Sequence, residues 1–411
     1  MTMFNAATTT PPAKYDPLQE SVKQNPYPYY AQLRATEPVL YLPHMDTYAV
    51  ANYDDVDKVL KNGRLFSSAQ FWPELLGEFD PVPEVAPMIS MDPPRHVHLR
   101  KLANKAFVPS KVASLQGRAV DIANQLIDDI IAKHGKEGEC DWVWDFTALF
   151  PVTVIGEVLG VPTERRAEFK IWVDDLLSAA NRQAYGPERL AKIQESSDKL
   201  RVFFEDLYDQ RKANPANDLI STLISAEVNG ETLTRLEVLQ MSTLLLIGGV
   251  ETTTNLLGST LVELHRHPDI YQRVRADHSL IPALLEEVLR YNPPVQMIFR
   301  HTTEDTELGG VKIPKGKAVM PLLASANRDE SKFENAETFD IDRKISVPLM
   351  SFGQGPHFCL GSFLSRMEAK AALEVAFSRL ELIEPVSDEV EWLDSYFARG
   401  PHHLRTRFKA R

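Results

Sequence analysis

Cysteine is scarce in this chain. Only Cys140 and Cys359 occur among 411 residues, so the sequence has no disulfide framework of the kind found in small secreted proteins. This scarcity fits a reducing compartment, and we expect a cytoplasmic protein. A zinc site is also disfavoured. Cys359 and the nearby His357 offer only two ligands, and Cys140 lies in a polar stretch without ligand-like spacing.

Long apolar runs are missing as well. The longest run near the middle of the chain, Leu244 to Val250, is far shorter than the ~20 residues that a membrane-spanning helix needs. The first residues, Met1 to Lys14, lack the basic and then apolar layout of a signal peptide. We therefore expect a soluble protein without a membrane anchor.

Positive charge is in deficit. Lysine and arginine number 45 against 57 aspartates and glutamates, which gives a formal net charge of −12 and argues against nucleic acid as a partner. Glycine- and serine-rich linkers and internal repeats are also missing, although the chain is longer than most single domains. We predict a flexible segment over residues 1–24 and one domain over residues 25–411, present as a monomer.

The most informative stretch that the sequence does contain runs from Ser351 to Gly361. Three glycines surround Cys359 there, and glycine lets a backbone turn tightly and approach a flat ligand closely. A helix is predicted over Ser362 to Arg379, so Cys359 precedes a helix N-terminus, which favours a thiolate over a thiol. The alternative is that Cys359 is a small buried apolar residue. A nicotinamide site is excluded, because Phe358 stands where the third glycine would be needed.

The spacing Phe-Gly-x-Gly-x-His-x-Cys-x-Gly from Phe352 to Gly361 resembles the haem-binding loop of the cytochromes P450. The resemblance extends over about Asn25 to Phe408. It implies that Cys359 is the axial ligand of the iron of haem b, with Phe352 and His357 among the cofactor-binding residues.

A second segment lies inside a long helix predicted over Leu236 to Leu264. Gly248 and Gly249 are poor helix formers, each costing ~1 kcal/mol relative to alanine, and they are followed by Val250, Glu251 and Thr252. Glycine would let a flat ligand lie against the backbone, while a threonine hydroxyl can disturb the helix. A kinked helix with a satisfied acid is the alternative. This segment resembles the oxygen-activating segment of the family, which implies that Glu251 delivers protons and that Thr252 hydrogen bonds to the oxygen intermediate.

Two cationic residues share one face of a further predicted helix. His96 and Arg100, four residues apart after Pro93 and Pro94, suit an anionic ligand. A solvated basic face is the alternative. The stretch resembles the segment of the family that binds the haem propionates, and Arg300 and His357 match two further propionate donors.

A buried ion-pair network is implied by resemblance alone. Glu287 and Arg290 form an i,i+3 pair that would mean little by itself. In the family this pair is joined by a later arginine, here Arg343, and we read the three residues as structural support for the cysteine loop.

Substrate-contacting residues are implied mainly by resemblance, with core packing as the alternative. The segment from Leu65 to Ile89 has no clean period, and long loops of this kind are often functional. Pro293 to Arg300 is predicted as an extended strand, and Asp394 to Arg399 as a turn near the pocket. The candidates are Phe71, Trp72, Leu75, Met88, Leu245, Gly248, Val295, Met297, Ile298 and Phe397.

Further elements follow from local patterns. Val39 to Leu42 and Thr47 to Val50 predict a β-hairpin. One helix is expected to end before Gly63, because glycine often stops a helix. Three further helices are expected where apolar residues recur at positions i, i+3 and i+4. Their predicted ranges are Asp54 to Asn62, Val112 to Lys136, Val152 to Glu157 and Glu164 to Ala180.

We therefore expect a mainly α-helical protein with small β-sheets and the cytochrome P450 fold, in which haem lies between the long central helix and the cysteine loop. The expected activity is that of a bacterial-type monooxygenase that inserts one oxygen atom of O2 into a hydrophobic molecule, by hydroxylation or epoxidation, in secondary metabolism. Terpenoids, steroids, fatty acids and polyketide intermediates all remain open as substrates.

Electrons are expected from NAD(P)H through a ferredoxin or flavodoxin-type donor. An acidic electron donor would dock on a group of basic residues of this chain. The alternative is that these residues form an ordinary solvated helix face. They are Arg95, Arg100, Lys101, Lys105, Lys111 and Arg366. A peroxide-driven hydroxylase of the same fold and a non-catalytic haem sensor are the alternative functions.

Overall fold

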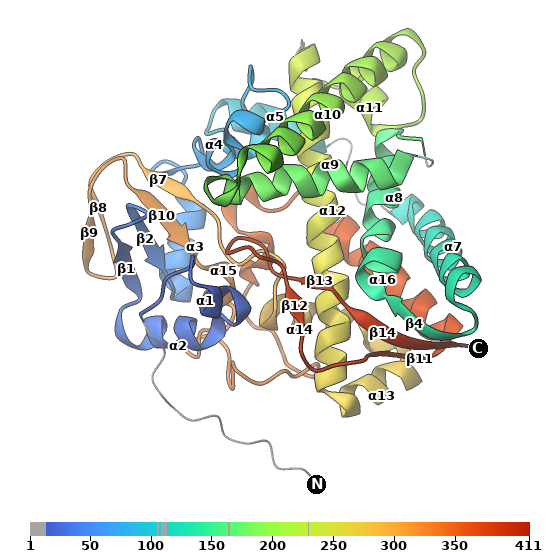
Figure 1. Ribbon diagram of the computed structural model, residues 1–411. Helices are drawn as coiled ribbons and strands as arrows, with labels where there is room; N and C mark the ends of the chain where they lie inside the picture. The colour runs from blue at the N-terminus through green and yellow to red at the C-terminus, as the bar shows by residue number, and fades with distance from the viewer. Residues whose placement is uncertain (1–13, 105–106, 108–112, 163–164, 229) are drawn as a thin grey trace.

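The computed structural model describes residues 14–411 except 105–106, 108–112, 163–164 and 229 (Figure 1). The chain is mainly α-helical with small sheets, as the sequence predicts. Among the described helices, none combines the length and the apolar character required to cross a membrane. The long helix α12 (Arg235–Arg266) runs through the middle of the molecule, and α9 (Arg166–Ser178) and α10 (Pro187–Ala213) cross it near one end.

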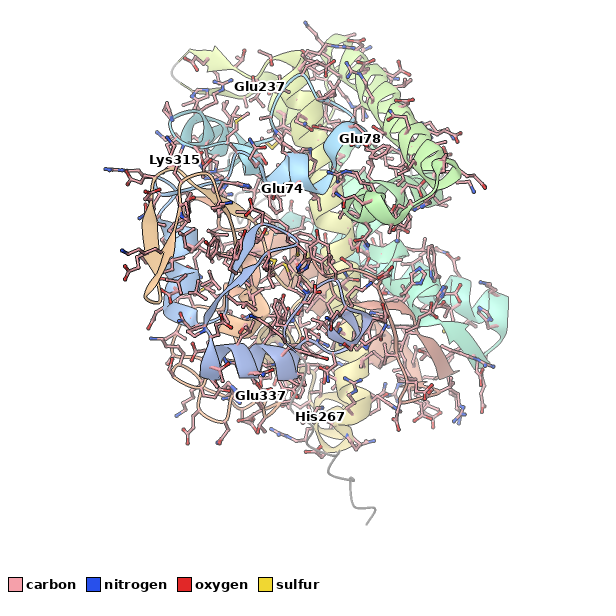
Figure 2. All side chains as sticks on the ribbon, turned by 60° about the vertical axis from the view of Figure 1, so that its left-hand side comes forward. Glu74, Glu78, Glu237, His267, Lys315 and Glu337 are labelled. Atoms are coloured by element: carbon pink, nitrogen blue, oxygen red, sulfur yellow. The ribbon has the colours of Figure 1, made fainter. Side chains whose placement is uncertain are left out.

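Helix α12 begins at a capping box. Thr234 accepts a hydrogen bond from the main-chain N–H of Glu237, and the Glu237 carboxylate accepts one from the N–H of Thr234, which satisfies two N–H groups that the first turn would leave unpaired. Figure 2 shows Glu237 and His267 at opposite ends of this helix. The helix is continuous through Gly248 and Gly249, so the glycines weaken it without breaking it.

Two core clusters meet along α12. Leu239, Leu246 and Val250 belong to a cluster shared with α4, α9 and α10. Leu256 and Leu261 belong to a second cluster shared with α7, α14 and α16. The segment from Gly248 to Thr252 therefore lies at the border between the two clusters, and neither cluster fills the space beside the helix there.

The helices around α12 agree closely with the sequence patterns. Helix α16 (Ser362–Arg379) has the predicted bounds, and the other predicted helices differ by a few residues at their ends. The remaining described helices are α1 (Glu20–Gln24), α2 (Tyr27–Thr36), α3 (Tyr53–Lys61), α4 (Phe71–Leu75), α5 (Arg95–Asn104), α7 (Gln116–His134), α8 (Leu149–Leu159), α11 (Leu219–Ser225), α13 (Pro268–Ala276), α14 (Ile281–Tyr291) and α15 (Leu323–Ala326).

The predicted hairpin is confirmed. Strands β1 (Val39–Leu42) and β2 (Thr47–Val50) pair antiparallel, and β10 (Ala318–Pro321), β7 (Arg300–Thr302) and β3 (Phe66–Ser67) complete a five-stranded sheet. A second sheet consists of β11, β14 and β4. The other strands are β4 (Glu137–Asp141), β5 (Glu227–Val228), β6 (Glu231–Thr232), β8 (Thr306–Leu308), β9 (Val311–Ile313), β11 (Leu380–Pro385), β12 (Glu391–Trp392), β13 (Pro401–His403) and β14 (Arg405–Ala410).

The predicted strand over Pro293 to Arg300 is wrong for most of its length. Only Arg300 belongs to a strand, and Val295 forms an isolated bridge with Ala398. Prolines at 293 and 294 have no N–H to donate to a ladder, and the main chain bonds irregularly instead, with the N–H of Gln296 donating to Phe397. The segment from Leu65 to Ile89 also differs from expectation, because it contains α4 and two 3-10 turns, which are too short to show a period.

Residues 14–24 are not a flexible leader. They include α1, and Val22 is buried in a small core cluster. The guanidinium of Arg399 donates to the carbonyl oxygens of Lys23 and Gln24. The rest of the predicted flexible segment, residues 1–13, lies outside the described residues.

Candidate active site

A cavity of about 290 Å³ lies between α12 and the loop that carries Cys359. Eighteen of the nineteen residues predicted to bind cofactor or substrate or to relay protons line it: Phe71, Trp72, Leu75, Met88, His96, Arg100, Leu245, Gly248, Gly249, Glu251, Thr252, Val295, Ile298, Arg300, Phe352, His357, Cys359 and Phe397. Residues from nearly the whole length of the chain therefore meet around one space.

Met297 is the exception. Its side chain is 1% exposed and packs with Tyr30 and other residues of the small core cluster near the N-terminus, on the far side of the segment from the cavity. The prediction for Met297 came from the resemblance to the family. Because this segment is irregular, Val295 and Ile298 reach the cavity and Met297 does not.

The loop around Cys359 is fixed by its own backbone and by its neighbours. The N–H of Cys359 donates to the carbonyl oxygen of Phe352 over 2.9 Å. Gly355 has a φ of +69°, and a Cβ at this position would lie 2.8 Å from the carbonyl oxygen of Leu60 at the end of α3. Glycine is thus required at 355 both by conformation and by space. The sulfur is held at the cavity wall.

Burial raises the pKa of the Cys359 thiol above its ordinary value. The N–H of Gly361 and the positive charges of Arg100 and Arg366 oppose this rise. The expectation that the helix N-terminus favours the thiolate therefore holds only in direction. In the protein alone burial is the larger effect, and a bound metal cation would be needed to deprotonate the thiol fully.

Four basic side chains gather at one side of the cavity: His96, Arg100, Arg300 and His357. The rings of His96 and His357 have centroids 4.0 Å apart. Burial lowers the pKa of Arg300 to about 10 and, together with the neighbouring positive charges of Arg300, His96 and Arg100, lowers that of His357 to about 3. This part of the cavity is unfavourable for cations unless an anion neutralises it.

Within the described part of the chain, no carboxylate is hydrogen-bonded to any of these four side chains. His96 is 2% exposed, and neither of its ring nitrogens has a hydrogen-bond partner among the described residues. Arg100 donates a hydrogen bond to the main-chain carbonyl oxygen of Phe358, and Arg300 donates one to that of Phe299. Buried basic groups without carboxylate partners are the arrangement that fits an anionic ligand. The two propionates of haem have the matching charge.

The opposite wall presents Gly248, Glu251 and Thr252. A Cβ at Gly248 would meet no atom within 4 Å, so open space lies against the helix there. Gly249 instead approaches the side chain of Ile155 in α8. Burial raises the pKa of Glu251 to about 7; the negative charge of Asp174 adds to this, and Lys170 opposes it. A carboxyl with this pKa can both take up and release a proton near neutral pH.

The predicted structural residues do form a network. Arg290 binds both carboxylate oxygens of Glu287 at 2.7 and 2.8 Å, and all of these atoms are buried. Arg343 approaches Glu287 to 3.4 Å and donates to the carbonyl oxygen of Thr338. The network joins α14 to the irregular segment over residues 334–343, which precedes the cysteine loop.

Several cavity residues carry no signal in the sequence. Leu244, Leu256, Leu289 and Leu364 look like ordinary core positions on helices. Glu368 of α16 stands between Arg366 and Lys370 and looks solvated, yet it is 2% exposed and burial raises its pKa well above the ordinary value. Only the three-dimensional arrangement shows that these residues face one space.

Comparison with known proteins gives consistent results. The sequence model of the family described as Cytochrome P450 matches residues 17–402. The chain is 38% identical over 386 residues to "Cytochrome P450 109" of Bacillus spizizenii, covering 93% of this chain and 91% of the relative. It is 36% identical to "Vitamin D(3) 25-hydroxylase" of Pseudonocardia autotrophica, covering 96% of each chain.

Solved structures agree. The chain superimposes on cytochrome P450 CYP109Q5 from Chondromyces apiculatus with a TM-score of 0.89 and 42% identity, covering 97% of this chain and 99% of the other. It superimposes on CYP109E1 from Bacillus megaterium in complex with testosterone with a TM-score of 0.83 and 34% identity, covering 93% and 99%.

Proposed function

This chain belongs to the cytochrome P450 family and is a haem-dependent monooxygenase, and on that premise we propose that Cys359 is its iron ligand and that it oxidises a neutral hydrophobic molecule bound beside Gly248. The observation that supports this assignment is the buried basic group of His96, Arg100, Arg300 and His357 on the same cavity as the Cys359 sulfur.

Different residues of the cavity would bind different parts of the cofactor. The Cys359 sulfur would bind the iron, and the four basic side chains would neutralise the propionates. Phe352 would contact the macrocycle. Haem, when bound, supplies the binding and reductive activation of O2; the residues of the chain supply position, protons and the exclusion of water.

Glu251 and Thr252 would move protons. The Glu251 carboxyl, with a pKa of about 7, takes a proton from solvent, and Thr252 lines the cavity next to it. The hydroxyl of Thr252 donates to the carbonyl oxygen of Gly248 over 2.8 Å, so its oxygen remains free to accept a hydrogen bond from water. A proton held at Glu251 can thus be passed into the cavity beside Thr252.

The substrate is proposed to be neutral. Among the described residues that line the cavity, the basic ones are the four assigned to the cofactor, and both acidic ones are glutamates, Glu251 and Glu368. A substrate carboxylate buried there would have no partner and would be repelled by any ionised glutamate. One similar protein has been solved in complex with testosterone and another is named as a vitamin D(3) 25-hydroxylase, which supports a steroid-like molecule over a free fatty acid.

A matched pair of ligands tests the neutrality of the substrate. Testosterone should shift the ferric haem from low to high spin. Testosterone sulfate, which has the same rings and one anionic group, should bind at least about 100-fold more weakly, because burying an unpaired charge is costly. Equal affinity for the two ligands would contradict the proposal.

Electrons are proposed to come from NAD(P)H through a ferredoxin or flavodoxin-type donor. Support from charge is weaker than the sequence suggests. Arg95 is ion-paired with Glu237 and Arg366 with Glu286, and Arg100 is turned toward Phe358. Lys101 is exposed, while Lys105 and Lys111 lie outside the described residues.

The cysteine assignment has a direct spectroscopic test. The reduced carbonyl adduct of the purified protein should show the red-shifted Soret band of a thiolate ligand, and Cys359→Ala should lose that band. A spectrum like that of a histidine-ligated globin would overturn the assignment. Turnover with peroxide but none with a reductase chain would instead favour the peroxide-driven alternative.

A further inference from the structure

A cluster of metal-binding side chains lies outside the cavity, on the two-stranded ribbon of β12 and β13 (Figure 1). Glu391, His402 and His403 each bring one ligand atom to within 4.8 Å of the other two. All three side chains are exposed, and none of them lines the cavity described above. The proposed monooxygenase activity gives these residues no role.

An irregularity in the ribbon explains how two consecutive histidines reach one point. In a regular strand, neighbouring side chains point to opposite faces. Here Glu391 pairs with His403 while Trp392 pairs with Pro401, so His402 is an extra residue without a partner across the ribbon. Such a bulge redirects side chains, and the two imidazole centroids are only 4.5 Å apart.

The spacing of the ligand atoms suits a small cation. Nδ1 of His402 lies 3.3 Å from Oε1 of Glu391. Two ligands bound tetrahedrally to zinc at ~2.0–2.1 Å are ~3.4 Å from each other. These two atoms are therefore already as far apart as they would be around a shared ion.

An outer carboxylate orients the third ligand. Nδ1 of His403 lies 2.5 Å from Oδ2 of Asp141, which leaves Nε2 of His403 available to a metal. The other oxygen of Asp141 accepts hydrogen bonds from the N–H groups of Val143 and Leu404. A histidine held by a carboxylate that is itself held by backbone is the usual arrangement behind a metal ligand.

The ribbon is held in place from one side. Trp144 donates from its indole nitrogen to the carbonyl oxygen of His402 over 3.2 Å. Its ring lies 6.4 Å from that of His402 and 6.0 Å from that of His403. The main chain at His402 is thus held without a metal, which lowers the ordering that binding would require.

We propose that Glu391, His402 and His403 bind one divalent transition-metal ion, with Asp141 positioning His403. Two imidazoles and one carboxylate suit Zn²⁺, and three protein ligands leave its fourth position to water. Because the site is exposed, the ion exchanges with solvent.

The experiment is a titration of the purified holoprotein with Zn²⁺ in competition with a chromophoric chelator. One equivalent should bind at micromolar or lower free Zn²⁺. His402→Ala and His403→Ala should each weaken binding by at least about 100-fold, and Asp141→Asn by about 10- to 100-fold, as outer ligands do. His44→Ala is the matched control, since His44 is also exposed and lies 3.2 Å from Asp16; it should bind like the wild type.

Unchanged haem absorbance and far-ultraviolet circular dichroism will show that the variants are folded. The proposal is overturned if the double variant of His402 and His403 binds Zn²⁺ as tightly as the wild type, if His44→Ala removes the binding, or if binding occurs only at millimolar Zn²⁺. None of these results bears on the monooxygenase assignment, because the cavity residues are unchanged.

Discussion

The hydroxyl of Thr252 donates a hydrogen bond to the carbonyl oxygen of Gly248, one turn earlier in α12. This bond occupies the hydroxyl hydrogen and leaves the oxygen as an acceptor. Since Thr252 follows Glu251 and both line the cavity, the pair can hold and receive protons at the border between two apolar clusters.

Removing the hydroxyl of Thr252 should lower the amount of product formed for each NAD(P)H consumed. In Thr252→Ala the cavity loses the acceptor beside Glu251, and product formed per NAD(P)H should fall by about 100-fold, the lower end of the range for general acid–base groups. Thr252→Ser keeps the hydroxyl and should stay within a few-fold of the wild type. The measurement is product against cofactor consumed; equal yields in the alanine variant and the wild type would contradict the proposed role.

Glu251 should give the reaction a pH dependence centred near 7, where its pKa lies. In Glu251→Gln the rate of product formation should no longer change with pH around 7, and the maximal rate should fall by about 100-fold. If the rate in the glutamine variant still changed with pH near 7, another group would have to control the pH dependence.

The same raised pKa affects stability with a defined sign. The folded protein keeps Glu251 protonated up to about pH 7, while the unfolded chain releases this proton above its ordinary value of 4.5. Stability is therefore lost as the pH rises from 4.5 to 7, by ~3 kcal/mol at most. Glu251→Gln should melt at a higher temperature than the wild type above pH 7 and at a similar temperature near pH 4.5.

The buried network on α14 should matter far more than an exposed ion pair. Arg290→Ala leaves Glu287 charged and buried, which should cost about 3–5 kcal/mol of unfolding free energy and release haem. Asp342→Ala breaks the exposed pair with Arg273 and should cost less than about 1 kcal/mol. The free energies of unfolding of the two variants are compared by denaturant titration with haem absorbance as the signal. Equal losses of stability would contradict the structural role of the Glu287 and Arg290 pair.

Gly355 offers a test of why the cysteine loop contains glycine. Gly355→Ala combines a positive φ with a clash at the Leu60 carbonyl, so we expect a loss above about 3 kcal/mol. Gly310 also has a positive φ, +80°, but open space around it, so Gly310→Ala should cost only about 1–2 kcal/mol. Thermal melting and haem content distinguish the two. Similar losses would mean that the contact with α3 is unimportant.

Arg182 joins the turn after α9 to α4, whose residues Phe71 and Trp72 line the cavity, and we expect this link to slow the passage of substrate. Arg182 lies in the turn after α9 and donates to the carbonyl oxygen of Glu74 over 3.1 Å, with its side chain 3.5 Å from the carboxylate of Glu78; both glutamates are labelled in Figure 2. Arg182→Ala should raise the rates of substrate binding and release several-fold with little change in affinity. Lys192→Ala, which breaks an exposed pair on α10, is the control. Unchanged stopped-flow rates would exclude a role in access.

The sequence reveals the site more readily than the irregular parts of the fold. Cys359, Glu251 and His96 stand in motifs with fixed spacing, and helix α14 has a clear amphipathic periodicity. Met297 was misplaced because the family resemblance grouped it with Val295 and Ile298, whereas the irregular segment after Pro293 and Pro294 turns its side chain into the small core cluster. Glu368 was missed because its burial depends on how α16 meets the cavity, which no local pattern records.

The contacts of Arg399 make the beginning of the chain relevant to its end. Its buried guanidinium is satisfied by the carbonyl oxygens of Lys23 and Gln24, while its neighbours Phe397 and Ala398 form part of the cavity wall. Shortened forms that start after residue 25 would leave this cation without two acceptors. We expect such forms to select substrates differently, even though they retain every residue proposed to hold haem.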